Sequence, residues 1–480
     1  MTALARKTVL PKFTLTVLAE KNDPLATRIS TSDEIPYFTR PKYSANNAQA
    51  SDGSPPPQYR LFPLILNGDG SPWAEANLYI LGLLDGDENP KMATVTSIAE
   101  DLAAFKRFLE NQPSINWLHF PENRLLRPTY RFNGHLRTLC RSAEIAWSTA
   151  KRRMAVVVRF YRWLVEERVF EPKNPLWKES ERYVHFTDSY GSPTSKRVAT
   201  TDLSIQVPSQ DDPYDGFIDD GAKLRPLPAN EQQWLLDALI SLGNTELTLI
   251  HIFALVTGAR IQTILTFRVG DIINSRPLPS QGPIRFPVGP GTGIDTKQDK
   301  RLVLHIPVWF YEMLQTYALS NRARNRRLRA NGGDTHAQYL FLTTRAVPFY
   351  LSKYDNGGSR MSGLRHGKVG QGVRQYITDY ILPSIREEHG AGFQYRFHDL
   401  RATFGMNVLD EKLKLVQEKR ITLAEALNYL QTVMGHSSLS VTERYVNYRG
   451  RLKLARSVQD EWELNIAKIA STALGHRDLK

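Results

Sequence analysis

Five residues in the second half of the chain carry side chains that could together bind a phosphate group and attack it. They are Arg260, His398, Arg401, His436 and Tyr445. A guanidinium group presents a planar fork of donors that matches two phosphate oxygens, and an imidazole can add a donor or take up a proton. A tyrosine phenol, with a pKa of ~10, needs nearby cations or a base to act as a nucleophile at pH 7. Together these residue types predict a phosphate-binding pocket to which a nucleophile is delivered.

Three of these residues, His398, Arg401 and Tyr445, also have a purely structural interpretation. His398 and Arg401 are three positions apart, so on a helix they share one face, and the apolar residues around them place that face close to a core. A buried guanidinium needs an acceptor. If no carboxylate lies nearby, a phosphate is the natural partner of Arg401. Asp399 is the structural alternative, although it points elsewhere on the same helix. Tyr445 alone is more often a core aromatic residue, and only the whole set favours chemistry.

Two of the predicted elements end where a reactive side chain must be placed. A largely apolar helix over 245–257 is expected to stop at Gly258 and to deliver Arg260. The stretch 434–438 is typical of a helix that ends in a turn, and Tyr445 follows nine residues after His436.

Strand patterns interrupt the helices at 284–288 and 302–306. They predict a small β-sheet inserted into a mainly α fold. Lys297 lies at the turn between the two strands, and Lys300 belongs to the same turn.

A helix expected from about 148 to 167 carries basic residues among apolar ones. Four of them are candidate DNA-binding residues: Arg152, Arg153, Arg159 and Arg162. Arg152 and Arg159 are seven apart and lie on nearly one stripe. The stripe is either a solvated face or a surface laid against DNA phosphates.

Composition restricts the classes of partner and site. The chain has 480 residues, a formal net charge of +13 and one cysteine. The positive surplus favours a polyanionic partner, nucleic acid first and an anionic membrane second. One cysteine excludes an internal disulfide and a multi-cysteine zinc site. Dispersed histidines and the lack of a matching nucleotide loop give no reason to expect a metal or a cofactor.

Basic residues break every apolar run near the N-terminus, and no run approaches a membrane span, so we expect a protein of the reducing cytoplasm.

Three motifs resemble the tyrosine recombinase family, also known as phage-type integrases. They are Thr257-Gly258-Ala259-Arg260-Ile261, His398-Asp399-Leu400-Arg401-Ala402-Thr403-Phe404, and Met434-Gly435-His436-Ser437-Ser438 running to Arg444-Tyr445. The resemblance covers about residues 90–450. It implies a helical, SAM-like core-binding domain followed by a catalytic domain with a small inserted sheet. The expected division is a region of unknown role (1–90), the core-binding domain (91–180), a linker (181–225), the catalytic domain (226–450) and a C-terminal helical tail (451–480).

The resemblance also implies a role for each residue of the site. Tyr445 would attack a DNA phosphodiester and form a 3′-phosphotyrosyl link. Arg260 and Arg401 would hold the non-bridging oxygens, and His436 would add a donor. Lys297, the preferred lysine of the turn, would protonate the departing 5′ oxygen, and Lys300 is the alternative. His398 would accept or donate a proton near the tyrosine, without metal or cofactor.

The implied function is site-specific DNA recombination, for integration or excision of a mobile element. The implied partners are double-stranded DNA and three further copies of the chain, in a homotetramer on paired sites. The implied location is the nucleoid of a prokaryotic cytoplasm. Two alternatives remain open: a type IB-like topoisomerase, and an inactive DNA-binding regulator of the same fold. One departure from the family bears on the site, because Thr263 stands where the family usually has an acidic residue.

Overall fold

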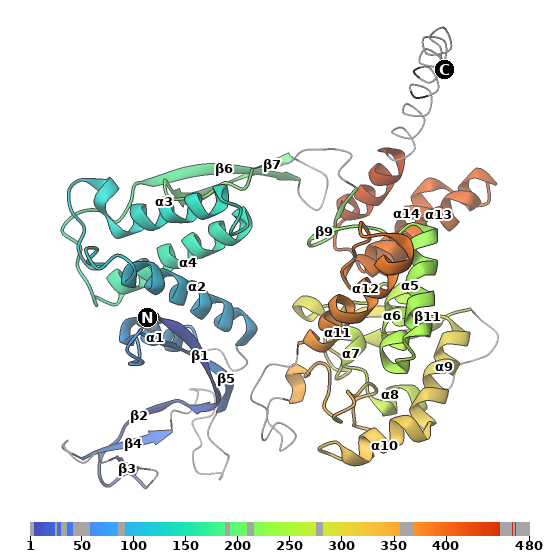
Figure 1. Ribbon diagram of the computed structural model, residues 1–480, viewed down its shortest axis with the longest axis horizontal. Helices are drawn as coiled ribbons and strands as arrows, with labels where there is room; N and C mark the ends of the chain where they lie inside the picture. The colour runs from blue at the N-terminus through green and yellow to red at the C-terminus, as the bar shows by residue number, and fades with distance from the viewer. Residues whose placement is uncertain are drawn as a thin grey trace, which may run out of the picture. The chain divides into compact units, whose positions relative to one another are not determined.

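The computed structural model describes most of the chain and divides it into two compact units (Figure 1). The described residues are 4–24, 26–29, 36–41, 58–84, 92–187, 193–208, 216–274, 282–355, 369–451, 463 and 466. Those up to 208 form unit 1, and those from 216 onward form unit 2.

Unit 1 is built around four helices whose apolar faces meet in an aromatic core. The helices are α1 (Ala74–Gly82), α2 (Met92–Glu110), α3 (Pro128–Arg141) and α4 (Trp147–Glu166), with the short 3₁₀ helix η3 (Arg124–Leu126) before α3. The expected helix at 148–167 is therefore confirmed as α4. Its rings of Phe160 and Tyr161 are fully buried. Cys140, the one cysteine, is buried in the same core.

Strands near the N-terminus of unit 1 share the core of the helices. The strands of unit 1 are β1 (Arg6–Thr14), β2 (Thr16–Leu18), β3 (Thr27–Ile29), β4 (Tyr37–Pro41), β5 (Gln58–Leu66), β6 (Glu179–Thr187) and β7 (Pro193–Thr201). β1 pairs antiparallel with β5, β4 lies between β2 and β3, and β6 pairs with β7. Phe62 and Ile65 of β5 are buried in one cluster with α2 and α4. Residues before 91 therefore contribute to the core of the helical unit.

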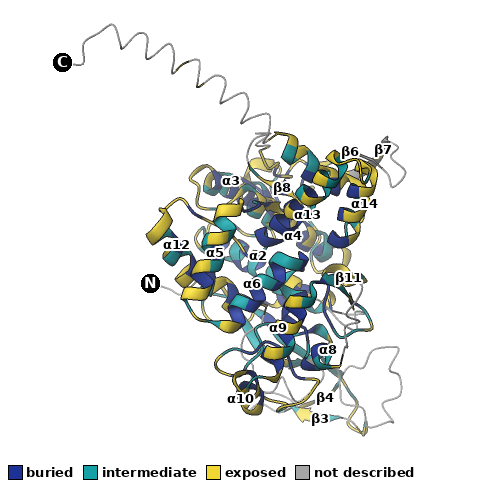
Figure 2. Cartoon of the chain, turned by 90° about the vertical axis from the view of Figure 1, so that its right-hand side faces the viewer, coloured by how far each residue is buried: buried dark blue, intermediate teal, exposed yellow. Residues whose placement is uncertain are grey.

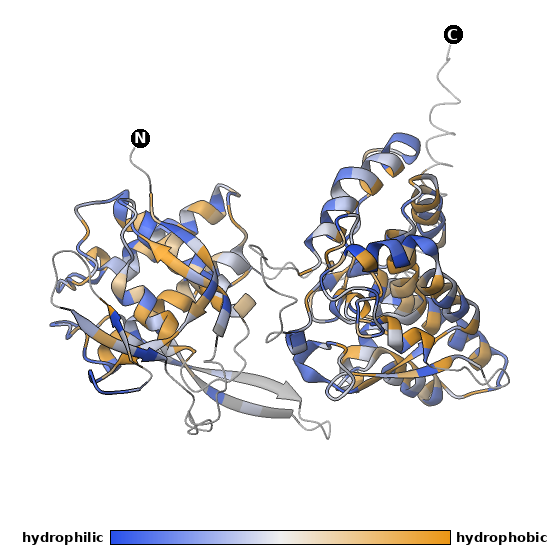
Figure 3. Ribbon diagram, turned by 90° about the horizontal axis from the view of Figure 1, so that it is seen from below, coloured by the Kyte–Doolittle hydropathy of each residue, from blue (hydrophilic) through white to orange (hydrophobic). Residues whose placement is uncertain are grey.

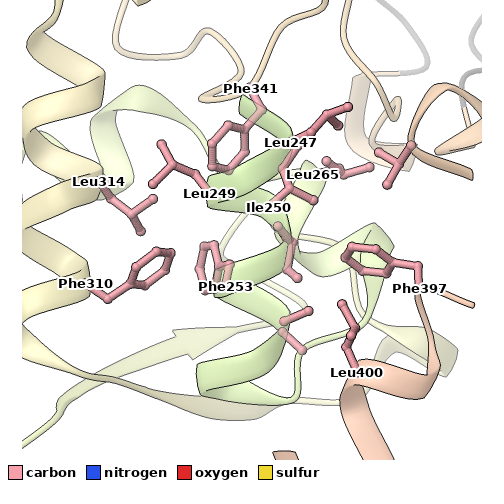
Figure 4. Packing of buried hydrophobic residues seen from close by; sticks show 14 of the residues in the cluster. Leu247, Leu249, Ile250, Phe253, Leu265, Phe310, Leu314, Phe341, Phe397 and Leu400 are labelled. Atoms are coloured by element: carbon pink, nitrogen blue, oxygen red, sulfur yellow. The ribbon is translucent and has the colours of Figure 1, made fainter. Parts of the chain in front are cut away.

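Unit 2 is mainly helical, and its core surrounds α6. The helices are α5 (Ala229–Ser241), α6 (Thr245–Thr257), α7 (Ile261–Leu265), α8 (Val269–Ile273), α9 (Val308–Leu319), α10 (Asn321–Arg329), α11 (Gln371–Tyr376), η7 (Ile377–Ile381), α12 (Leu382–His389), α13 (Asp399–Gln417) and α14 (Leu423–Met434), with the short 3₁₀ turns η4 (Lys297–Asp299) and η5 (Lys353–Asp355). Residues 439–451 are also helical. Phe253 of α6 packs between Phe310 of α9 and the side chains of Phe397 and Leu400 (Figure 4).

The helices of unit 2 differ in how far they are buried. α10 is mostly exposed, whereas the first half of α13 is almost wholly buried (Figure 2). Within each unit, hydrophobic residues alternate with hydrophilic ones along the helices (Figure 3). This is the pattern expected when one face of a helix packs on a core.

Two small hairpins of unit 2 matter for the site. β10 (Ile284–Val288) pairs antiparallel with β11 (Leu302–Ile306), which confirms both predicted strands. β8 (Ile218–Asp219) pairs with β9 (Lys223–Leu224) across a tight turn. The expected fold class, mainly α with a small inserted sheet, is confirmed.

Neither a membrane-spanning helix nor a cluster of metal ligands is found among the described residues. None of the helices in this part of the chain combines the length and apolar character that a membrane span requires. The same residues contain no group of three or more histidine, cysteine, aspartate or glutamate side chains placed to hold a metal ion.

Candidate active site

Arg260 is placed by the abrupt end of α6. Gly258 ends the helix in the left-handed conformation, with φ of 64°, and its N–H donates to Ala254. A Cβ atom at Gly258 would lie 2.5 Å from the Phe404 ring, so the close approach of α13 also requires glycine there. Arg260 then precedes the first residue of α7. The predicted helix end and its arginine are both found at these positions.

The Arg260 guanidinium has an incomplete set of partners. Its Nε atom is buried and has no hydrogen-bond partner among the residues that the structure describes. The Oδ1 atom of Asp220 lies 4.0 Å from its Nη2 atom. Burial, and then the charge of Arg401, lower the pKa of Arg260 to about 10. An arginine held in this way has donors available for an anion.

Arg401 lies in the first turn of α13 and is only 4% exposed. All three of its guanidinium nitrogens donate hydrogen bonds. Nη1 donates to the Gly258 carbonyl at 2.9 Å, and Nη2 donates to the Met434 carbonyl at 2.6 Å. Nε donates to Oδ2 of Asp220 at 2.8 Å. Two carbonyls at helix ends therefore hold the guanidinium plane and direct its Nε edge at the carboxylate.

His436 follows the end of α14, where Gly435 is in the left-handed conformation with φ of 63°. Its Nδ1 atom lies 3.0 Å from the Thr442 hydroxyl, and its Nε2 atom lies 3.3 Å from Oδ2 of Asp220. Thr442 thus fixes one ring nitrogen while the other faces the same carboxylate as Arg401.

Tyr445 lies in the helical segment 439–451, and its side chain is fully buried. The ring packs so closely on α13 that a Cβ atom at Gly405 would lie 2.5 Å from its Cε1 atom. The phenol oxygen donates to Oδ2 of Asp220 at 3.2 Å. Burial, and then the negative charge of Asp220, raise the pKa of Tyr445 well above its usual value.

The two candidate lysines both lie near the arginines. Lys297 lines one pocket with Arg260 and Arg401. Lys300 donates from Nζ to the Gly435 carbonyl at 2.8 Å. Burial, and then the charges of Arg260 and Arg401, lower the pKa of Lys300.

His398 is the residue immediately before α13 and is partly buried. Burial, and then the charges of Arg260 and Arg401, lower its pKa to about 4. At neutral pH the imidazole is therefore uncharged and keeps a lone pair that could accept a proton.

Asp220 is a residue of the site that sequence reasoning missed. It lies in the turn between β8 and β9, within the stretch expected to be a linker. Its Oδ2 atom accepts hydrogen bonds from Arg401 and Tyr445, and Nε2 of His436 lies within 3.3 Å of the same oxygen. Burial by itself raises the pKa of this carboxyl, but His436 and Arg401 outweigh that effect and hold it far below its usual range. No local pattern marks it, because its partners lie 181 to 225 positions away along the chain.

Thr263, which stands where an acidic residue was expected, has a structural role. Its hydroxyl donates to the Asp295 carbonyl at 2.8 Å, and its side chain is buried. It therefore ties α7 to the turn that follows β10 and supplies no charge to the site.

The four arginines predicted to bind DNA lie on α4 of unit 1. Arg152 and Arg153 reach the buried Asp101 carboxylate, at 3.1 and 3.7 Å. Arg162 donates to Glu179 at 3.0 Å. These three side chains are therefore held by acidic groups of their own unit.

Arg159 is exposed and donates from Nε to the Ala155 carbonyl of its own helix at 3.3 Å. Arg152 is exposed on the same stripe, two helical turns earlier. The α4 stripe, defined by Arg152 and Arg159, is thus open to solvent within unit 1, and Arg152 on it is also paired with Asp101.

Comparisons with known proteins give structural similarities only. No protein-family model and no curated protein matches the sequence. A λ integrase dimer bound to a COC′ core site aligns with a TM-score of 0.43 and 15% identity, over 79% of this chain and 96% of that one. The Tn1549 transposon integrase in complex with circular intermediate DNA aligns with a TM-score of 0.40 and 13% identity, over 77% of this chain and 94% of that one. A λ integrase tetramer bound to a Holliday junction aligns with a TM-score of 0.41 and 14% identity, over 78% and 76% of the two chains. At this level of similarity residue roles do not transfer.

Proposed function

We propose that the chain is a tyrosine recombinase, which cleaves and rejoins DNA strands through a phosphotyrosyl intermediate. One observation carries this proposal. The guanidinium of Arg401, the imidazole of His436 and the phenol of Tyr445 all direct a polar atom at one anionic oxygen, within 3.3 Å. Arg260, whose Nε has no hydrogen-bond partner in the described part of the chain, lies beside the same carboxylate. Such an arrangement suits a phosphate held by cations next to a nucleophile.

The proposed chemistry is an in-line displacement at phosphorus. The phenol oxygen of Tyr445 attacks, the bond from phosphorus to the 5′ oxygen breaks, and the strand remains attached to the protein through its 3′ phosphate. Arg260, Arg401 and His436 stabilise the charge that develops on the non-bridging oxygens, and one such donor contributes ~3–4 kcal/mol. Because the ester energy is kept in the new bond, the reverse step rejoins the strands.

Two protons move in this step. The uncharged imidazole of His398 is proposed to accept the proton that Tyr445 loses. Lys297 is proposed to give a proton to the departing 5′ oxygen, and Lys300 is the alternative donor. A substrate whose 5′ bridging oxygen is replaced by sulfur needs no such proton. It should therefore rescue Lys297→Ala if Lys297 is the donor, and Lys300→Ala if Lys300 is.

DNA binding is proposed to use the α4 stripe in addition to the site. The net charge of +13 supports a polyanionic partner. Exchange between two duplexes cleaves four strands, and each chain offers one Tyr445, so a homotetramer is the assembly proposed for recombination. Integration or excision of a mobile element is the proposed biological outcome.

The test is covalent trapping on DNA that flanks the protein's own gene, first located by footprinting. When a nicked duplex of the protected site is cleaved, the short strand between the cleavage point and the nick dissociates. Because that strand is then missing, the reverse step cannot occur, and the covalent adduct accumulates and survives denaturing electrophoresis. Wild type should form the adduct and Tyr445→Phe should not. Tyr429→Phe, at an exposed tyrosine of α14, is the matched control and should behave as wild type.

The other outcomes separate the alternatives. An adduct formed by Tyr445→Phe would show that another residue is the nucleophile. A footprint without any adduct would favour an inactive regulator. Relaxation of any supercoiled plasmid, independent of its sequence, would favour a topoisomerase.

A further inference from the structure

The β8–β9 hairpin carries an acidic side chain into the centre of the candidate site. Ile218 and Leu224 are buried in one cluster with Tyr445, so the hairpin is part of the packing around the nucleophile. Between its strands, the Asp220 N–H donates to the Ala222 carbonyl at 3.0 Å, and Gly221 has a positive φ of 73°. This tight turn directs the Asp220 side chain inward.

The Asp220 carboxylate uses the groups that a phosphate would need. Its Oδ2 atom lies 2.8 Å from Nε of Arg401, 3.3 Å from Nε2 of His436 and 3.2 Å from the phenol oxygen of Tyr445. Carboxylates and phosphates both accept charge-assisted hydrogen bonds from guanidinium groups. Two groups cannot occupy one position, and two anions placed side by side in a buried site repel each other strongly. A phosphodiester in contact with these three groups would therefore collide with the carboxylate.

We propose that Asp220 is an internal stand-in for the scissile phosphate and must withdraw before a DNA phosphodiester can bind between Arg260 and Arg401. This inference rests on the proposed function for the identity of the phosphate. It assigns the turn of the β8–β9 hairpin as an autoinhibitory contact that the substrate displaces.

Arg260 gives the reason why a DNA phosphodiester can displace the Asp220 carboxylate. Asp220 reaches Arg401 closely, but its other oxygen stops 4.0 Å from Arg260, whose Nε has no partner among the described residues. A phosphodiester has two non-bridging oxygens and can engage both guanidinium groups. It thus gains contacts that the carboxylate does not make.

The contacts on either side of the turn indicate how much has to move. The Asp219 carbonyl accepts a hydrogen bond from Arg444 at 2.8 Å, and the Lys223 carbonyl accepts one from Arg396. Since both strands are held in this way, we expect the change to be confined to Asp220 and the two residues after it.

The negative charge of Asp220 also affects the nucleophile. After burial, it is the main influence that keeps the Tyr445 phenol protonated. With the carboxylate in place, the phenol is both a donor to Asp220 and a poor nucleophile. In the DNA-free site, Asp220 therefore both blocks the position of the phosphodiester and keeps Tyr445 from acting as a nucleophile.

The first test measures anion binding without DNA, by calorimetry of the full chain with inorganic phosphate. Asp220→Ala should bind phosphate at least tenfold more tightly than wild type, because the competitor is gone. Asp219→Ala, which removes an adjacent exposed carboxylate, is the matched control and should remain within twofold of wild type. Equal or weaker binding by Asp220→Ala would overturn the proposal. If Asp220→Ala does not fold, Asp220→Asn, which keeps the shape and loses the charge, must show at least a threefold gain.

The second test uses the nicked duplex. At low DNA concentration Asp220→Ala should form adduct about tenfold faster than wild type, because half-saturation occurs at a lower DNA concentration while the maximal rate constant of adduct formation is preserved. A residue that positions Arg401 or His436 for catalysis would instead lower that maximal rate constant when removed, and that result would overturn the stand-in role. If no variant forms an adduct, the proposed function fails, whereas the phosphate measurement still decides whether Asp220 competes with an anion.

Discussion

Replacing Arg401 by lysine separates the shape of the guanidinium from its charge. The guanidinium donates to two backbone carbonyls and one carboxylate from a side chain that is 4% exposed. A lysine keeps the charge but has no planar fork, so it cannot reach Gly258, Met434 and the anion at once. The variant therefore loses directed donors and retains a cation.

The expected losses of reaction rate and of stability in Arg401→Lys follow from these contacts. Loss of one aligned donor to the transition state costs ~3–4 kcal/mol, which corresponds to a decrease of about 10²–10³-fold in the rate of adduct formation. A buried carbonyl left without its donor costs about 1–3 kcal/mol of stability. We therefore expect Arg401→Lys to fold, to melt at a lower temperature and to react at least a hundredfold more slowly.

The assay is single-turnover adduct formation on the nicked duplex, with saturating protein and with circular dichroism to verify folding. Arg386→Lys is the matched control, because Arg386 also donates from Nε to a backbone carbonyl, that of Phe393 at 2.8 Å. It should react within about twofold of wild type. A folded Arg401→Lys protein that reacts within tenfold of wild type would refute the role given to the guanidinium fork.

Three further predictions concern stability and binding. Gly405→Ala should displace the Tyr445 ring, lower stability by about 1–3 kcal/mol in urea unfolding and abolish the adduct; Gly134→Ala on α3, with nothing within 4 Å, should be neutral or slightly stabilising. Burial lowers the pKa of His251 to about 4, below the ~6.5 of an unfolded histidine, so unfolding takes up a proton between these values. The free energy of unfolding should therefore fall as the pH is lowered through this window, by up to about 1.4 kcal/mol per pH unit. In the same urea titrations the free energy of unfolding of His251→Gln should fall less. An identical pH dependence of the two proteins would contradict the buried neutral form. Arg159→Ala should weaken DNA binding uniformly across sequences and reduce the salt slope by about 1 in anisotropy titrations, and an unchanged slope would exclude it from the interface.

Local features of the site were predictable from the sequence because neighbouring residues determine them. The end of α6 at Gly258 follows from a glycine after an apolar helical run, and it puts Arg260 at its position. The β10–β11 strands follow from their apolar pattern. The sequence therefore determined the mainly helical fold class and the candidate residues of the site.

Only the tertiary structure decided how these residues are held. The carbonyls of Gly258 and Met434 that orient Arg401 come from two other helix ends, and Asp220 comes from a hairpin 181 positions earlier in the chain. Likewise, Phe62 of β5 enters the core of the unit 1 helices without a marked pattern of its own. The physical reason is that capping and periodicity act over a few residues, whereas the partners of a buried charge are chosen by packing between distant segments. The sequence thus supplied the cations and the nucleophile, and the fold supplied the carboxylate that now lies between them.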